Sequence, residues 1–103
     1  MTTKKAKLKA MNYLETLNKG PLTLGDIVHS IRTSEGMTQN DLAEKLGISK
    51  SHLSDIENGR KTVSPERAMK FAEILGYSKK QFVRLALQQI LDDSGIEMLV
   101  EVA

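Results

Sequence analysis

The chain contains no cysteine, which excludes disulfides and thiolate metal sites. Tryptophan is also absent, and aromatic residues make up only 4% of the 103 residues. A core must therefore be built from Leu, Ile, Val, Met and Ala, a mixture that suits helices better than sheets. No apolar run approaches the roughly 18 residues of a membrane span, and no apolar signal segment follows the basic N-terminus. We therefore expect a cytoplasmic protein with no membrane partner.

Signatures of catalysis are missing as well. His29 and His52 are the only histidines, and neither stands in a metal-ligand spacing such as H-E-x-x-H. There is no Gly-rich phosphate loop, and the carboxylates are scattered along polar faces where solvation is the usual explanation. We therefore expect no enzyme, no catalytic residue, no metal and no cofactor.

What the chain does contain is a regular series of helix boundaries. Five hydroxyl residues each precede a stretch of apolar residues at helical spacing, where the hydroxyl accepts a hydrogen bond from an unpaired first-turn amide: Thr23, Thr38, Ser49, Ser64 and Ser78. Three of them have an acid or Gln three residues later, as in a capping box. The expected helix ends are Gly20-Pro21, Gly36, Gly47, Gly59 and Gly76.

These boundaries predict an all-α protein, a compact helical bundle of five to six helices. The length suits one domain with a single core. The apolar spacing places the helices near residues 3–18, 24–35, 38–46, 49–57, 65–75 and 78–92. The apolar faces include Ile27 and Val28 in the second helix, and Phe82, Leu85, Ala86 and Ile90 in the last.

The two ends of the chain differ in charge. Residues 1–20 predict a basic helix with an apolar stripe of Leu8, Met11, Leu14 and Leu17. Residues 93–103 form an acidic tail whose alternation has the period of a strand. On one side of that strand lie Ile96, Met98, Val100 and Val102. Since a lone strand has no sheet to join, the tail either packs irregularly or pairs with its symmetry mate as a short dimerisation strand.

The central part of the chain, residues 21–92, contains two short helices joined by a tight turn at Gly47. Ala43 is small where the second helix must come close, and Gly47 can take the positive φ that leaves the first helix. Ile48, Leu53 and Ile56 then seat the second helix on the core. This pattern predicts a helix-turn-helix, although an ordinary hairpin of two helices would also tolerate it.

Residues 24–76 resemble the Xre/Cro family of helix-turn-helix DNA-binding domains, which includes phage repressors and many antitoxins. The segments that carry the resemblance are "MTQNDLAEKLGIS", "LSDIENGRK" and "SPERAMKFAEILG". The resemblance implies a lambda-repressor-like core of five helices, with residues 49–57 as the recognition helix.

With Leu53 and Ile56 buried, four residues of that helix face outward, where they would reach base edges in the major groove: Lys50, Ser51, Ser54 and Asp55. Lys50 can donate to guanine, and the serines can donate or accept. Asp55 leaves two interpretations open. It accepts from cytosine, or it is a solvated acid or an intramolecular partner of Lys50 or Arg60.

The resemblance also implies roles around the recognition helix. Four residues match family positions that contact or brace the DNA backbone: Gln39, Asn58, Arg60 and Lys61. Such contacts supply affinity and register. Arg32 and Glu57 resemble a family pair that forms an internal ion bridge, so we interpret them as structural. His52 lies at the edge of the helix and is expected to be a partly exposed bystander.

These features predict a sequence-specific regulator of transcription that binds double-stranded operator DNA as a homodimer. The candidates for the dimer interface are the helix near residues 78–92 and the tail, of which the tail is favoured. The extra basic helix and the absence of a sensor domain resemble antitoxins of the HigA or HipB type, autorepressors that also bind a cognate toxin. Two alternatives remain: a free-standing Xre-family repressor of phage or chromosomal origin, and a protein-binding adaptor.

Overall fold

The computed structural model describes residues 22–103, and within them the chain forms five α-helices and no strand. The helices are α2 (Leu24–Ser34), α3 (Gln39–Leu46), α4 (Lys50–Glu57), α5 (Pro65–Leu75) and α6 (Lys79–Asp93). The predicted all-α class is therefore confirmed, with boundaries close to those expected. The predicted helix near residues 3–18 and its apolar stripe lie outside the described residues.

All five predicted hydroxyl residues cap their helices. Each side chain accepts a hydrogen bond from the backbone N–H three residues later. Thr23 with Asp26 and Thr38 with Asp41 form complete capping boxes. The third expected box, at Ser78, is only half formed, because the Gln81 side-chain oxygen accepts from the Arg84 guanidinium instead.

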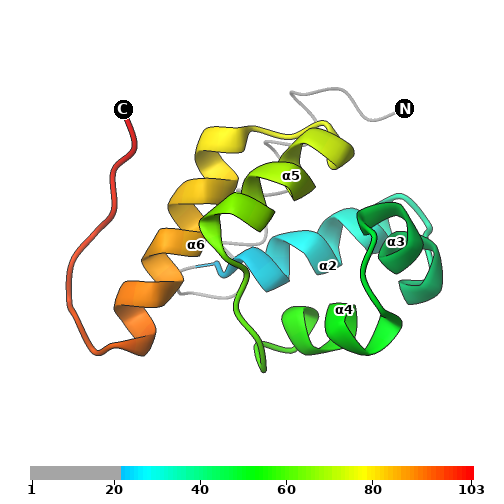
Figure 1. Ribbon diagram of the computed structural model, residues 1–103, viewed down its shortest axis with the longest axis horizontal. Helices are drawn as coiled ribbons and strands as arrows, with labels where there is room; N and C mark the ends of the chain where they lie inside the picture. The colour runs from blue at the N-terminus through cyan, green and yellow to red at the C-terminus, as the bar shows by residue number, and fades with distance from the viewer. Residues whose placement is uncertain (1–21) are drawn as a thin grey trace.

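The helices are arranged in two groups around α2 (Figure 1). The neighbours α5 and α6 pack extensively on each other, while α3 and α4 form a second pair and α4 lies against α2. The core between them contains Leu22, Leu24, Ile27, Val28, Ile31, Leu42, Ala43, Leu46, Leu53, Ile56, Val63, Ala68, Phe71, Ala72, Leu75, Phe82, Leu85 and Ala86. As the composition required, only two of these side chains are aromatic.

The last helix buries less of its surface than its sequence predicts. Phe82, Leu85 and Ala86 are buried as expected, but Ile90 is 45% exposed. In α6, which runs on to Asp93, no residue after Ala86 belongs to the buried core. Ile90 thus shares the apolar face of α6 by its spacing but lies outside the buried core.

Candidate nucleic-acid interface

The turn between α3 and α4 has the geometry that its residues predict. Gly47 ends α3 with φ 72°, a left-handed conformation that favours glycine. The N–H of Ile48 then donates to the carbonyl of Ala43 at 3.0 Å. Ala43 is buried, and Ile48 packs against the core. The short turn therefore fixes α4 at the surface with one face on the core and one face free.

The two faces of α4 differ as the recognition-helix assignment requires. Leu53 and Ile56 are 0% and 2% exposed, so they anchor the helix to the core. The predicted base-contacting residues lie on the other side: Lys50 and Ser51 are exposed, and Ser54 and Asp55 are half-buried. Lys50 and Ser51 stand in the first turn of α4, the end that enters the major groove when a helix-turn-helix docks.

An open hollow of about 360 Å³ occupies this face. It is lined by six of the eight residues predicted to contact DNA: Gln39, Lys50, Ser51, Ser54, Asp55 and Arg60. The remaining two lie beside it. Asn58 caps the end of α4 and donates from its side chain to the Ser54 carbonyl at 2.8 Å, and Lys61 is exposed in the following loop. The fold thus gathers residues from α3, α4 and the loop after α4 on one surface.

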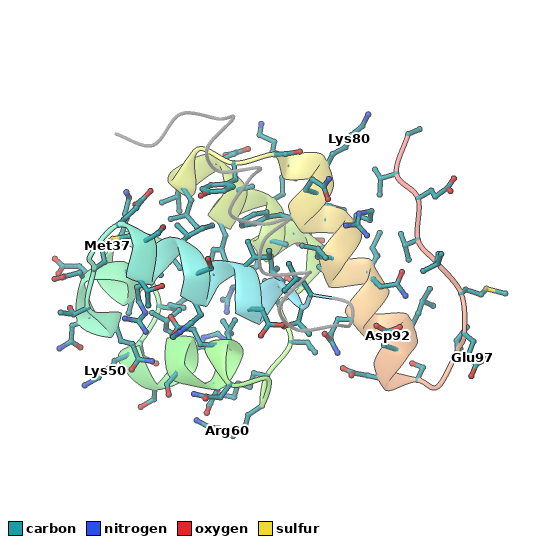
Figure 2. All side chains as sticks on the ribbon, turned by 180° about the vertical axis from the view of Figure 1, so that it is seen from behind. Met37, Lys50, Arg60, Lys80, Asp92 and Glu97 are labelled. Carbon is teal, nitrogen blue, oxygen red and sulfur yellow. The ribbon has the colours of Figure 1, made fainter. Side chains whose placement is uncertain are left out.

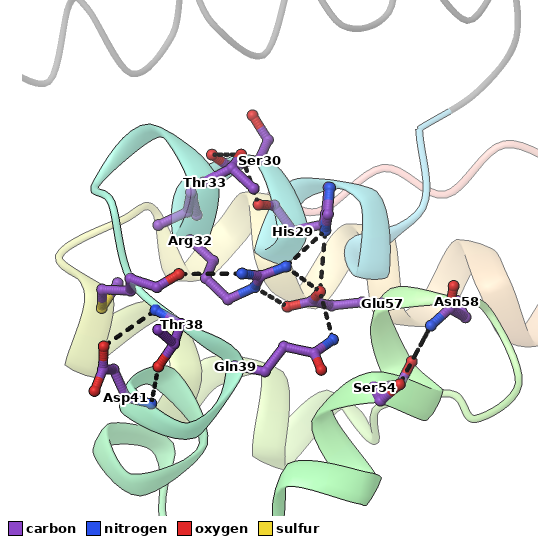
Figure 3. A network of polar contacts seen from close by, with 12 residues as sticks. His29, Ser30, Arg32, Thr33, Thr38, Gln39, Asp41, Ser54, Glu57 and Asn58 are labelled. Atoms are coloured by element: carbon purple, nitrogen blue, oxygen red, sulfur yellow. Dashed lines mark hydrogen bonds and ion pairs between the residues drawn. The ribbon is translucent and has the colours of Figure 1, made fainter.

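The predicted ion bridge between Arg32 and Glu57 is confirmed, and it is bidentate (Figure 3). Arg32 Nε lies 2.8 Å from Glu57 Oε2, and Nη2 lies 3.0 Å from Oε1. A third guanidinium nitrogen donates to the Met37 carbonyl at 3.1 Å. This network joins α2, α4 and the loop before α3, so it holds the recognition helix to the scaffold.

Two further side chains converge on the same carboxylate. The Gln39 amide donates to Glu57 Oε1 at 3.3 Å, so the residue predicted to brace the DNA backbone also braces Glu57. His29 Nδ1 lies 3.0 Å from Oε1 and 3.3 Å from Arg32 Nη2 (Figure 3). Sequence reasoning missed His29. The only available signal was its spacing of three residues from Arg32 on one helix, which places the two side chains on one face.

The electrostatics of Glu57 follow from this environment. Its side chain is only 3% exposed, and burial alone would raise its pKa. The hydrogen bonds from Arg32, His29 and Gln39 outweigh burial and hold the pKa below its usual range. Glu57 is therefore a charged structural centre, and not a solvated acid.

Asp55 has the intramolecular partner that one of its two interpretations required. Arg60 Nε donates to Asp55 Oδ1 at 2.8 Å, and Lys61 Nζ lies 3.6 Å from Oδ2. The hydrogen bond from Arg60 lowers the pKa of this carboxyl group. No corresponding contact joins Asp55 to Lys50 among the described residues.

His52 is half-buried, as expected for a residue at the edge of the recognition helix. Its ring lies 3.5 Å from Arg67 Nη1 on α5. Burial and the charge of Arg67 lower the pKa of His52.

The four predicted dimerisation residues differ in exposure. Val100 and Val102 are half-buried, whereas Ile96 and Met98 are exposed. The Gln88 side chain holds the tail along α6, because its amide donates to the Met98 carbonyl and its oxygen accepts from the Val100 N–H, both at 2.8 Å. Leu99, which the pattern placed on the other side, is 90% exposed. Pairing of this tail with a second copy stays a prediction.

The described helices show no membrane-spanning candidate, since none from residue 22 onward combines sufficient length with sufficient hydropathy. Over the same residues, His, Asp and Glu side chains form no group of three suited to a metal ion.

Comparison with known proteins agrees with this geometry. A family model described as helix-turn-helix matches residues 28–82, which is more than half of the chain. The chain belongs to this helix-turn-helix family. It is also 27% identical over 74 residues to the ImmF control region 10 kDa protein of Bacillus phage phi105, covering 72% of this chain and 81% of that protein. The protein is accordingly a DNA-binding transcriptional regulator of the Xre type.

Proposed function

We propose that this helix-turn-helix protein is a dimeric repressor that binds an operator in its own control region. The observation that carries the proposal is the hollow on the free face of α4, where Lys50, Ser51 and Ser54 point away from the core. Lys50 and the two serines contact base edges. Gln39, Asn58 and Lys61 hold the phosphate backbone on either side and set the register.

A homodimer follows from the size of the recognition helix. One helix of eight residues reads only a few base pairs, too few for selectivity in a genome. Two copies on half-sites about 34 Å apart double the length read. The operator should then contain two half-sites as an inverted repeat. A footprint on the upstream DNA should cover both half-sites.

The test is affinity for the chain's own upstream region, measured at several salt concentrations. The double variant Lys50→Ala/Ser54→Ala should weaken specific binding about tenfold or more, since a base contact contributes roughly 1–3 kcal/mol of discrimination. Lys80→Ala is the matched control, because Lys80 lies at the opposite side of the molecule from Lys50 and Arg60 (Figure 2). If no specific complex forms, or if both variants bind alike, the interface is wrongly assigned.

The phage relative favours a free-standing repressor as the biological setting. That protein is named for the ImmF control region, and the match to this chain covers 81% of its length.

An antitoxin role is the second candidate. Exposed apolar residues in the tail, Met98 at 66% and Leu99 at 90%, offer a surface for a partner protein. The discriminating observation is the neighbouring reading frame. A toxin-sized gene in the same operon, whose product co-purifies with this chain, supports the antitoxin role, and an isolated gene counts against it. Co-purification of a partner without any DNA binding would instead support an adaptor.

A further inference from the structure

Asp55 is unusual on a DNA-binding surface, because its negative charge faces the phosphates. In this chain, the carboxylate is already engaged on both sides. Oδ1 accepts from Arg60 Nε at 2.8 Å, and Oδ2 faces Lys61 Nζ at 3.6 Å. A cytosine amino group would have to compete with these cations for the carboxylate oxygens, and Asp55 would have to bring its charge into a negatively charged groove. Asp55 is therefore poorly suited to contact a base itself.

The backbone of Asp55 strengthens the same connection. Its carbonyl accepts from the N–H of Arg60 at 2.8 Å and from the N–H of Lys61 at 3.2 Å. The loop that leaves α4 is thus folded back onto Asp55 by main-chain and side-chain bonds together. Arg60 consequently has a defined position, although its side chain is 60% exposed.

The guanidinium of Arg60 is held over the recognition face. Nε is occupied by Asp55, Nη2 lies 3.5 Å from Ser54 Oγ, and Nη1 has no hydrogen-bond partner among residues 22–103. Arg60 also lines the hollow that contains Lys50 and Ser51. An arginine whose Nε is fixed by a carboxylate presents its two terminal nitrogens in a plane, which matches the O6 and N7 acceptors of guanine.

The geometry points to Arg60 as a base-reading residue that recognises guanine, with Asp55 as the positioning residue that orients its guanidinium. This inference rests on the proposed operator binding and names one of its specificity determinants. It reassigns Arg60 from the DNA backbone to a base, and Asp55 from a base to Arg60. Lys61, the other cation on Asp55, keeps a phosphate role.

The experiment is selection of preferred sites from a library of randomised duplexes by the full chain. Affinity is then measured for the selected duplex and for copies in which single G·C pairs are changed to A·T. At one guanine position, the wild type should bind the selected duplex about tenfold or more tightly than the copy with A·T at that position. Arg60→Lys should lose most of this discrimination while keeping the charge, because a lysine does not reproduce the planar fork.

The role of Asp55 is tested at the same guanine. Asp55→Ala should lower the discrimination there, while Asp55→Asn should retain part of it, since the amide oxygen still accepts from Nε. In an Arg60→Ala background, Asp55→Ala should have no further effect on that position. Lys61→Ala is the control. It should reduce the slope of log affinity against log salt concentration by about one and leave the base preference unchanged.

Two outcomes overturn the inference, and they are distinguishable. If wild type enriches no motif, operator binding fails and the inference fails with it. If wild type enriches a motif whose preferences Arg60→Lys leaves intact, operator binding stands and Arg60 contacts only phosphate.

Discussion

At the scale of single residues, partners decide what each charged side chain does. Glu57 and Asp55 are two residues apart on one helix, but Glu57 is buried under the Arg32 guanidinium and Asp55 faces the recognition surface. The first holds α4 to the scaffold, and the second organises the loop that follows. Two carboxylates of similar chemistry therefore stabilise different parts of the molecule.

Removing one member of the Arg32–Glu57 pair should be costly. Arg32→Ala leaves the Glu57 carboxylate buried with His29 and Gln39 as its remaining side-chain partners, and loss of one partner from a buried pair costs about 3 kcal/mol. Urea unfolding followed by circular dichroism measures this change in free energy. Lys79→Ala, which removes an exposed pair with Glu73, should change it by no more than about 0.5 kcal/mol. Equal effects of the two variants would contradict a structural role for Arg32.

The pair should also make stability depend on pH. The folded pKa of Glu57 lies below its usual range, so its stabilising effect is complete above the ordinary glutamate pKa. That contribution is lost as the pH falls through the ordinary value toward the lower folded one. Urea midpoints recorded between about pH 6 and about pH 3 should therefore fall more steeply for wild type than for Glu57→Gln. Parallel curves would show that Glu57 has an unshifted pKa.

At the scale of elements, the position of α4 depends on how closely α2 approaches it. Gly25 in the first turn of α2 is buried, and a Cβ at that position would overlap the carbonyl oxygen of Ile56. The helices meet backbone to backbone there. This contact and the Arg32–Glu57 pair both join α2 to α4.

Gly25→Ala should therefore destabilise the protein by about 2–3 kcal/mol, because backbone atoms must move to admit a methyl group. Chemical denaturation provides the measurement. Gly36→Ala is the control, since its added Cβ meets open space and only the positive φ of 69° opposes it, at about 1 kcal/mol. A smaller effect at Gly25 than at Gly36 would mean that α2 and α4 have room to separate.

At the scale of the whole molecule, the helical core and the C-terminal tail are separable. The tail after Ser94 is mostly exposed. It is attached to α6 by two hydrogen bonds of the Gln88 side chain and by the backbone N–H groups of Gly95 and Ile96. The exposed apolar residues of the tail therefore remain available to contact a second copy.

Truncation after Ser94 should convert the predicted dimer into a monomer in sedimentation velocity. The same truncation should lower the free energy of unfolding by about 2–4 kcal/mol, because it removes four hydrogen bonds between the tail and α6. A truncated chain that stays dimeric would show that helix packing carries the interface, most directly through α6. A truncated chain that unfolds would show that the tail is part of the core.

The sequence by itself determined what depends on neighbouring residues. Caps such as Thr23 and Thr38 and the turn at Gly47 are set by contacts within a few positions, and the apolar spacing of Leu53 and Ile56 indicates the buried face of α4. These residue types therefore predicted the all-α class and the helix-turn-helix. The Arg32–Glu57 pair, 25 residues apart, was foreseen only through family resemblance.

Contacts between positions that no local pattern connects depend on the tertiary structure alone. His29 meets Glu57 across 28 residues, and Gly25 is small because the Ile56 backbone lies beside it. Asp55 had several cations within reach, and the fold of the loop after α4 selected Arg60. Each outcome depends on the distance between atoms after the helices have packed, a quantity that the order of residues alone does not specify.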